Sequence, residues 1–376
     1  MTKVLIAMSG GVDSTVAAYL LKEKGFDLVG LTMRLYPPTP EKFIGENGEL
    51  DIHRIDLTQD EESARDMAQS LGIDFHLVDL SAHFEEKVIR PFIKTYEKGW
   101  TPNPCVFCNK YLKFGALFSY AKIYGLDFVS TGHYASVESV QGTYQLKRGR
   151  DQSKDQSYML FQMGQEELSK VLFPLGGFYK EEVRTIAEKA GLASWNRPDS
   201  EDICFIPDGN YVEFCQNHDH KIYPPGTLVN RRGEVLGKGK SPMAYTIGQR
   251  RGLGLALPRP AYVLDKNMER GEVIVGDEEE LFFQEIFCPD WNWMSGKRPE
   301  GLCRAQVKIR YLAKEAPCLI KSLSSSSGPD QVLIRFDRPQ RAPAPGQSAV
   351  AYDGDLVLGG GTITKIFDPE DGEKNF

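Results

Sequence analysis

Residues 3–25, KVLIAMSGGVDSTVAAYLLKEKG, decide the fold of the N-terminal part of the chain. The apolar run at residues 4–7 is typical of a parallel strand that is buried on both faces. After a turn at residues 9–14, apolar side chains recur at helical spacing up to Leu21, and Gly25 marks the end of that helix. The stretch therefore predicts a strand, a glycine-containing turn and a helix.

The turn of this unit is suited to hold an anion. Gly10 and Gly11 allow the backbone to approach a ligand closely, and the helix N-terminus offers N–H groups and a partial positive charge. The turn lacks the Lys of a Walker A loop and the G-x-G-x-x-G spacing of a dinucleotide site. The pattern SGGVDS resembles instead the PP-loop of the N-type ATP pyrophosphatases, which adenylate a substrate oxygen. An ordinary tight β–α turn is the alternative. Because Asp13 and Ser14 belong to an anion cradle and not to a core, we expect their replacement by Ala to abolish adenylation and to leave the fold intact.

Strands and helices alternate after this unit. Strands are predicted at residues 28–33, 75–80 and 127–131. Helices are predicted at 58–71, with Thr58 and Glu61 as a capping box, from about Ala82, and at 113–124. Residues 36–50 indicate a loop, and residues 154–206 contain further helical patterns. This alternation predicts an α/β fold with a parallel sheet, whose ligands bind beyond the strand C-termini. The SGGVDS loop and the TGHY turn at residues 131–134 both follow such strands.

From Pro207 onward, glycine and proline become frequent and short strands are predicted to replace helices. Residues 261–276 alternate like a hairpin with its turn at 267–271. A small antiparallel barrel or sandwich is predicted from strands at residues 304–311, 318–321, 331–336, 348–352 and 356–358. We predict three domains: a PP-loop catalytic domain at 1–206, a small β-rich basic domain at 207–280, and an antiparallel β-barrel at 281–376.

Charge is distributed unevenly along the 376 residues, whose net charge is −7. Residues 221–260 carry eight Lys or Arg against the single acidic Glu234, and can form a surface for a phosphate backbone. A solvated charged face is the alternative. There is no apolar run of about 18 residues and no signal peptide, so we expect no membrane span and a cytoplasmic location. Seven cysteines without a disulfide framework also favour a reducing compartment.

Two cysteine segments stand out. TPNPCVFCNK at residues 101–110 contains Cys105 and Cys108, and its prolines predict a stiff loop before the helix at 113. DSEDICF at residues 199–205 contains Cys204. Separated cysteines together with an adenylating loop suggest sulfur transfer, with a thiolate as nucleophile. The remaining cysteines are expected to be small buried hydrophobes: Cys215, Cys288, Cys303 and Cys318.

Seven motifs in this order resemble the tRNA-specific 2-thiouridylase (MnmA) family over residues 1–366. They are SGGVDS, TPNPxxxCNxxxKF, TGHYA, KDQSYML, SEDICFI, YTIGQRRGLG and PGQ…YDGDLVLGGG. The resemblance implies an enzyme that uses ATP and Mg²⁺ to thiolate the wobble uridine of tRNAs for Lys, Glu and Gln. It also implies two partners, the tRNA and a sulfur carrier or cysteine desulfurase relay protein.

The resemblance further implies site residues. ATP would be bound by Ala7, Met8, Ser9, Gly10, Gly11, Val12, Asp13, Ser14, Met33 and Gly132. The target base and the tRNA would be contacted by Asn103, Pro104, Cys105, His133, Lys154, Asp155, Gln156, Arg310, Tyr311 and Gln347. Among the latter, Arg310 and Lys154 suit phosphate contacts and Tyr311 can stack on a base.

The mechanism has more than one interpretation. The resemblance implies a persulfide on Cys204, with Cys108 as the partner nucleophile that forms a transient disulfide. Many family members have Asp where this chain has Cys105, so Cys105, Cys108 and Cys204 are also predicted as ligands of a [4Fe–4S] cluster or of zinc. Two other functions are alternatives: a different PP-loop adenylating enzyme, of the argininosuccinate synthase type, and a non-catalytic ATP-binding regulator.

Overall fold

The structure is a computed structural model that describes residues 1–36, 57–197, 203–206, 208–323 and 329–367. The predicted loop at 36–50 lies almost wholly outside these ranges. The chain forms two compact units. The first contains residues 1–89 and 106–199, and the second contains residues 90–105 and 200–376.

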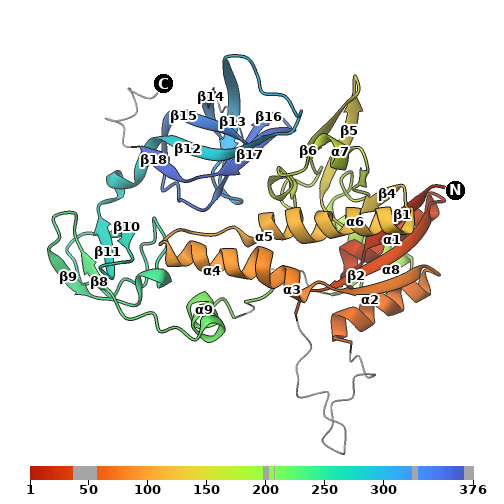
Figure 1. Cartoon of the computed structure of the whole chain (residues 1–376), viewed down its shortest axis with the longest axis horizontal. Coiled ribbons are helices and arrows are strands. Elements are labelled where there is room, and N and C mark those ends of the chain that lie inside the picture. Colours follow the sequence, from red (N-terminus) through yellow and green to blue (C-terminus); the bar gives the residue numbers. More distant parts are fainter. Residues whose placement is uncertain (37–56, 198–202, 207, 324–328, 368–376) are drawn as a thin grey trace, which may run out of the picture. The chain divides into compact units, whose positions relative to one another are not determined.

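A five-stranded sheet organises the first unit, in the order β3-β2-β1-β4-β7 (Figure 1). Its strands are β1 Lys3–Ala7, β2 Asp27–Arg34, β3 Asp74–Asp79, β4 Phe128–Ser130 and β7 Val171–Leu172. All four pairings are parallel, as predicted. Because β1 lies between β2 and β4, the segments that follow these three strands emerge side by side at one edge.

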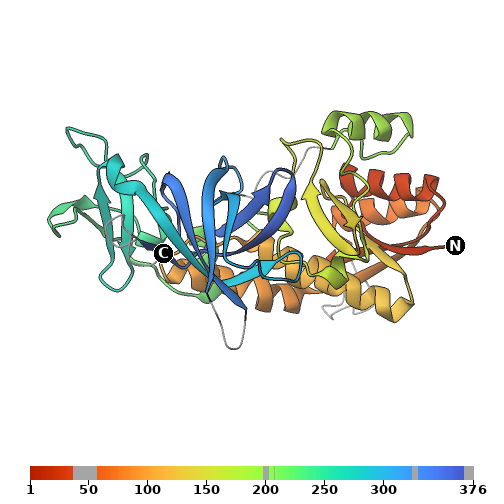
Figure 2. The same ribbon diagram turned by 90° about the horizontal axis from the view of Figure 1, so that it is seen from above.

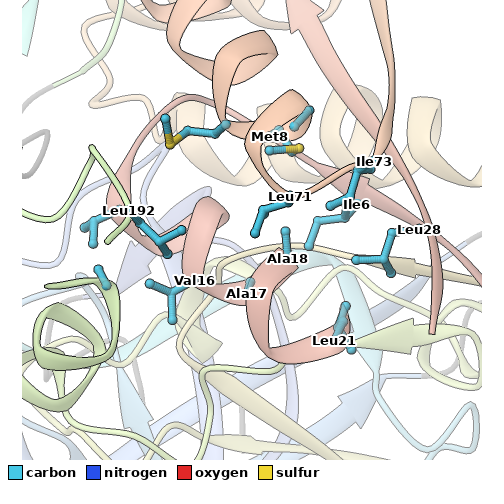
Figure 3. Packing of buried hydrophobic residues seen from close by; sticks show 14 of the residues in the cluster. Ile6, Met8, Val16, Ala17, Ala18, Leu21, Leu28, Leu71, Ile73 and Leu192 are labelled. Atoms are coloured by element: carbon cyan, nitrogen blue, oxygen red, sulfur yellow. The ribbon is translucent and has the colours of Figure 1, made fainter. Parts of the chain in front are cut away.

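Helices cover the sheet. Three of them are α1 Val12–Glu23, α2 Gln59–Ser70 and α8 Lys180–Lys189. Their buried side chains share one core with the strands. In Figure 3, Val16, Ala17 and Leu21 of α1 lie among Ile6 and other apolar side chains of this cluster. The helix α6 Gly115–Tyr124 contacts β1 and β4. Each fully buried aliphatic side chain of this kind contributes about 1.5–3 kcal/mol.

The N-terminus of α2 is fixed by the predicted capping box. The Thr58 hydroxyl accepts from the Glu61 N–H at 3.3 Å, and the Glu61 carboxylate accepts from the Thr58 N–H at 2.8 Å. The same carboxylate forms a buried bidentate pair with Arg34, with N–O distances of 2.7 and 2.8 Å. This pair ties the start of α2 to the end of β2, which is the edge of the sheet where ligands are expected.

The prediction of a stiff loop at residues 101–110 is wrong from Pro104 onward. The chain is helical from α5 Pro104–Phe107 through a π-helical turn Cys108–Phe114 into α6. Proline is favourable in the first turn of a helix because its missing N–H needs no partner there. Cys105 and Cys108 therefore lie on helical turns and not in an extended loop.

Other elements complete the first unit and the connection out of it. The helix predicted from Ala82 begins one residue earlier and comprises α3 Ser81–Phe84, a π-helical turn Glu85–Ile89 and α4 Arg90–Glu97. An antiparallel hairpin, β5 Ala135–Val140 and β6 Thr143–Arg148, was not predicted. It is followed by a 3-10 turn Ser157–Met159 and α7 Gln165–Leu168. Among the described residues, no helix is long and apolar enough to span a membrane.

The second unit contains a small four-stranded sheet in the order β10-β11-β8-β9. Its strands are β8 Thr227–Val229, β9 Val235–Lys238, β10 Tyr262–Asn267 and β11 Glu272–Gly276. The predicted hairpin is confirmed by the antiparallel pairing of β10 with β11. The expectation that strands replace helices from Pro207 onward is wrong at α9 Tyr211–Asp219, which Asn210 caps by accepting from the Glu213 N–H.

Six antiparallel strands form a closed barrel, and its pairing order is β12-β15-β14-β13-β16-β17 with β17 returning to β12. Figure 2 shows these strands, in cyan and blue, from above. They are β12 Phe282–Trp293, β13 Leu302–Lys308, β14 Ala316–Leu323, β15 Asp330–Arg341, β16 Ser348–Asp353 and β17 Leu356–Thr362, and β18 Lys365–Phe367 pairs with β12.

The barrel confirms the predicted fold class, but β12 was missed. Pro289 interrupts its apolar pattern, and a proline usually argues against an internal strand. The ladder accommodates Pro289 at a register shift between Cys288 and Trp291, where β12 makes no regular pair with β15. The three domain boundaries stay predictions.

A buried lysine in the small sheet makes the stability of the second unit depend on pH. Lys266 lies on β10, and its ammonium donates to the carbonyl of Tyr245 at 2.8 Å. Burial lowers the pKa of Lys266 to about 8, whereas an unfolded lysine titrates near about 10.4. Between these values the unfolded chain binds a proton that the folded chain does not, so this group makes stability rise with pH.

We expect the free energy of unfolding of the wild type, relative to Lys266→Met, to rise by about 3 kcal/mol between pH 8 and about 10.4. Urea unfolding of both proteins at several pH values measures this difference. Below pH 8 the lysine is protonated in both states, so the difference should be constant there. A flat difference across the whole window would contradict the burial of the ammonium.

Candidate nucleotide and sulfur-transfer site

The structure brings the predicted ATP residues of the first unit together. The SGGVDS loop follows β1, Met33 lies near the end of β2, and the TGHY turn follows β4. At Gly132 of that turn, an added Cβ would lie 2.8 Å from the Asp13 carbonyl carbon and 2.9 Å from the Ser14 nitrogen. Only glycine therefore allows the turn to lie directly against the loop.

Hydroxyl groups fix the shape of the loop. The Ser14 hydroxyl donates to the Gly11 carbonyl at 3.1 Å and accepts from the Ser9 N–H at 3.2 Å. At the base of the loop, the Thr32 hydroxyl of β2 donates to the Met8 carbonyl at 2.6 Å. Gly10 has φ +74°, which glycine adopts without strain. The loop is thus closed on itself and anchored to the neighbouring strand.

Asp13 is the charged group of the loop, and its partners were not predicted. The Lys180 ammonium donates to both carboxylate oxygens of Asp13 at 2.8 and 2.7 Å, and the Tyr134 hydroxyl donates to one of them at 2.8 Å. The Lys180 side chain is 10% exposed and that of Asp13 is 34% exposed. Lys180 was not among the predicted site residues. The sequence signal that could have indicated it is its position as the first residue of the helix KEEVRTIAEK.

The predicted tRNA contacts of the first unit have internal roles in this structure. His133 is buried, its Nδ1 lies 2.7 Å from the Thr131 hydroxyl, and burial lowers the pKa of His133 well below its usual range. The buried Asp155 carboxylate accepts from the N–H groups of Gly149 and Ser157. In the same segment, Gln156 bonds the backbone of Tyr134 through its own N–H and through its side-chain oxygen, and Lys154 donates its N–H to the Asp151 carbonyl. These groups order the TGHY turn and its neighbourhood, and their contact with tRNA stays a prediction.

In the second unit, Gln347 of the barrel holds the TPNP segment. Its amide donates to the carbonyls of Thr101 and Pro102 at 3.2 and 3.0 Å. The buried Asn103 and Pro104 follow directly.

Arg310 also acts inside the second unit. Its guanidinium donates to the carbonyls of Ile247 and Ala342 at 3.2 and 2.6 Å, so it joins the connection between β9 and β10 to the residue that follows β15. Tyr311 lies three residues beyond the end of β13. Contacts of Arg310, Tyr311 and Gln347 with tRNA stay predictions.

The three candidate cysteines differ in exposure. Cys108 is buried in the first unit, whereas Cys105 and Cys204 are exposed in the second. Residues 198–202, which precede Cys204, lie outside the described ranges. Within those ranges, no group of three or more His, Cys, Asp or Glu side chains could hold a metal ion. The [4Fe–4S] and zinc alternatives stay predictions. The other four cysteines are buried or half-buried; burial raises the pKa of the Cys215 and Cys318 thiols to about 12.

The basic segment of residues 221–260 borders two grooves of the second unit. Their volumes are about 370 and 580 Å³, and residues 257–261 line both. Arg250 lines the first groove, Arg231 and Arg232 line the second, and Arg259 lines both. Arg231 forms an ion pair with Glu280, so its charge is partly neutralised within the protein.

Known proteins resemble this chain along nearly its whole length. Three family models match: a tRNA methyl transferase HUP domain at residues 2–208, a tRNA methyl transferase PRC-barrel domain at 213–277 and an aminomethyltransferase beta-barrel domain at 283–363. The tRNA-specific 2-thiouridylase MnmA of Clostridium perfringens is 44% identical over 365 residues, which cover 97% of this chain and 99% of the relative. The tRNA-specific 2-thiouridylase MnmA 1 of Caldanaerobacter subterraneus subsp. tengcongensis is 45% identical, covering 96% and 98%.

The solved structures are less similar to this chain than the curated relatives are. The U34-tRNA thiolase NcsA from Methanococcus maripaludis with its [4Fe–4S] cluster is 18% identical, with a TM-score of 0.34, and the match covers 58% of this chain and 65% of that one. A 4-thiouridine synthetase in complex with RNA and ATP is also 18% identical, with a TM-score of 0.34, covering 57% and 50%.

A parallel sheet with a PP-loop at its C-terminal edge, followed by a small sheet and a closed barrel, defines a HUP-type nucleotide-binding protein with two β-rich appendages. The chain belongs to the tRNA-specific 2-thiouridylase (MnmA) family, a family of tRNA sulfurtransferases. The predicted family and the predicted enzyme class are confirmed.

The ion pair at the loop changes what we expect of Asp13. Asp13→Ala leaves the ammonium of Lys180 buried without its carboxylate, and should lower the free energy of unfolding by about 3 kcal/mol. The double variant Asp13→Ala/Lys180→Met should recover most of this loss, because it removes the orphaned charge. Denaturant unfolding measures both. Ser14→Ala keeps the ion pair and is the matched control, with a smaller loss of about 1 kcal/mol from its hydroxyl hydrogen bonds. Equal stability of Asp13→Ala and the wild type would contradict the coupling.

Proposed function

We propose that this chain catalyses the ATP-dependent 2-thiolation of the wobble uridine in tRNA, of the Lys, Glu and Gln type. The observation that carries the proposal is the PP-loop with its Asp13–Lys180 pair in a chain that matches 2-thiouridylases over 97% of its length. The substrates are then ATP, a tRNA and a sulfur donor, which is a sulfur carrier or cysteine desulfurase relay protein. A cytoplasmic location belongs to the same proposal.

Adenylation is the first step. The C2 oxygen of the uracil attacks the α-phosphorus of ATP, the bond to the β-phosphate breaks, and pyrophosphate leaves. The N–H groups at the start of α1 provide partial positive charge for the phosphates, whereas the ammonium of Lys180 is paired with Asp13. A Mg²⁺ ion that accompanies the nucleotide would neutralise charge on the phosphates. To hold it, the Asp13 carboxylate would have to exchange its bonds with Lys180 and Tyr134 for the metal.

Sulfur transfer is the second step. The terminal sulfur of a Cys204 persulfide attacks C2, and AMP leaves with its oxygen. The Cys108 thiolate then attacks the Cys204 sulfur, which frees the 2-thiouridine and leaves a Cys108–Cys204 disulfide. The persulfide sulfur gains the two electrons that the two cysteines lose. An external dithiol then reduces the Cys108–Cys204 disulfide back to two thiols. The exposure of Cys204 supports loading from another protein, because a donor must reach this sulfur.

Pyrophosphate release with and without tRNA tests the proposal against its two rivals. A thiouridylase releases pyrophosphate in a tRNA-dependent manner, another PP-loop adenylating enzyme does so with a different acceptor, and a regulator binds ATP without turnover. Mass spectrometry of tRNA nucleosides from cells that lack this chain provides the second readout. The absence of 2-thiouridine supports the proposal, and an unchanged 2-thiouridine level refutes it.

The basic segment predicts a salt-dependent tRNA affinity. Charge reversal at Arg232 or Arg250 should weaken binding and reduce the slope of log affinity against log salt concentration by about one per lost phosphate contact. Arg231→Glu should have a smaller effect on the slope, because Glu280 already pairs with Arg231. Filter binding at several salt concentrations measures the slopes. Slopes equal to that of the wild type would show that this face is only solvated.

Cys105 separates the two sulfur mechanisms. In the persulfide mechanism Cys105 only lines the base site, so Cys105→Ala slows turnover but leaves sulfur loading on Cys204. In the cluster mechanism it is one of three ligands, so the same change abolishes cluster and activity together. The readouts are intact mass after incubation with a persulfide donor and iron content after anaerobic purification. We expect iron-free protein that thiolates tRNA; strict dependence on iron with an inert persulfide donor would refute the persulfide mechanism.

A further inference from the structure

The side chain of Arg197 reaches back from the end of the first unit to the SGGVDS loop. Its Nη1 donates to the Gly10 carbonyl at 2.8 Å and to the Ser63 hydroxyl at 3.1 Å, and its Nη2 donates to the Asp60 carboxylate at 2.8 Å. Ser63 in turn donates to the Gly10 carbonyl at 3.3 Å. One carbonyl of the loop therefore accepts from two side chains, and the charge-assisted bond from Arg197 is the shorter.

The bond to the Gly10 carbonyl sets the direction of a neighbouring N–H group. The Gly10 carbonyl and the Gly11 N–H belong to the same peptide unit, which is trans, so they point in opposite directions. Because the carbonyl is drawn toward Arg197 and α2, the Gly11 N–H faces away from them, and no described residue accepts it. Gly11 is the N-cap of α1, where N–H groups bind anions.

Arg197 is itself held in place. The Arg184 guanidinium of α8 donates to the carbonyls of Trp195 and Arg197, each at 3.0 Å. Arg184 lies one turn after Lys180, which holds Asp13. A single helix thus fixes the loop twice, once directly through Lys180 and once through the segment that carries Arg197.

We propose that Arg197 is a positioning residue for the triphosphate, because it orients the Gly10–Gly11 peptide so that the Gly11 N–H faces the nucleotide. Glycine on both sides of this peptide permits other orientations at little cost. Without the guanidinium, only the longer bond from Ser63 restrains it. The inference rests on the proposed binding of ATP at this loop.

Nucleotide affinity of the full chain tests the inference, with ATP and adenosine as the two probes in calorimetric titrations. Arg197→Met should weaken ATP binding roughly ten- to hundredfold, as loss of one charge-assisted hydrogen bond does. Adenosine has no phosphate, so its affinity should stay within about twofold. Arg197→Lys keeps a donor and should recover part of the ATP affinity. Asp60→Asn removes only the exposed ion pair and is the matched control, with ATP affinity near wild type.

The outcomes are distinct. Equal ATP affinity of Arg197→Met and the wild type would overturn the inference, and an equal loss for ATP and adenosine would show a merely structural role. If Arg197→Met does not fold, Ser63→Ala replaces it, and a smaller loss selective for ATP is then expected; no selective loss overturns the inference. A wild type that binds adenosine but no ATP would overturn the proposed function together with it.

Discussion

The ion pair between Lys180 and Asp13 is the interaction on which the first unit depends. A largely buried ammonium is unfavourable unless a carboxylate lies beside it, and the loop supplies that carboxylate. The two residues are 167 positions apart, so their contact joins the start of the chain to α8. The Tyr134 hydroxyl donates to the same carboxylate, so the TGHY turn is also held at this ion pair. Three segments that are distant in sequence thus share one charged centre.

Close backbone contact around this centre suits a phosphate ligand. Gly132 lies so near the loop that a Cβ would meet the backbone of Asp13 and Ser14, and a Cβ at Gly10 would lie 2.6 Å from the Asp60 carbonyl oxygen. Packing of this kind leaves N–H groups and a helix N-terminus as the polar surface of the loop. The same packing lets a long side chain such as Arg197 control the direction of one peptide.

The cysteines divide the proposed chemistry into two parts. The adenylating loop and Cys108 belong to the first unit, and Cys204 belongs to the second. Cys204 is exposed, as a group that receives sulfur from another protein has to be, whereas Cys108 is buried. This difference in exposure fits the loading role proposed for Cys204 and the later attack proposed for Cys108.

The sequence alone determined the features that depend on neighbouring residues. The strand–loop–helix at residues 3–25, the Thr58–Glu61 capping box and the hairpin at 261–276 follow from periodicity, caps and turn residues. Motif order also identified the family. Tertiary structure alone decided the rest: Pro289 is tolerated because β12 shifts register there. Lys180 and Arg197 acquire their roles through contacts 167 and 187 positions away. The free energy that such a contact contributes depends on the burial of its groups and the distance between them, and both arise only when the chain folds.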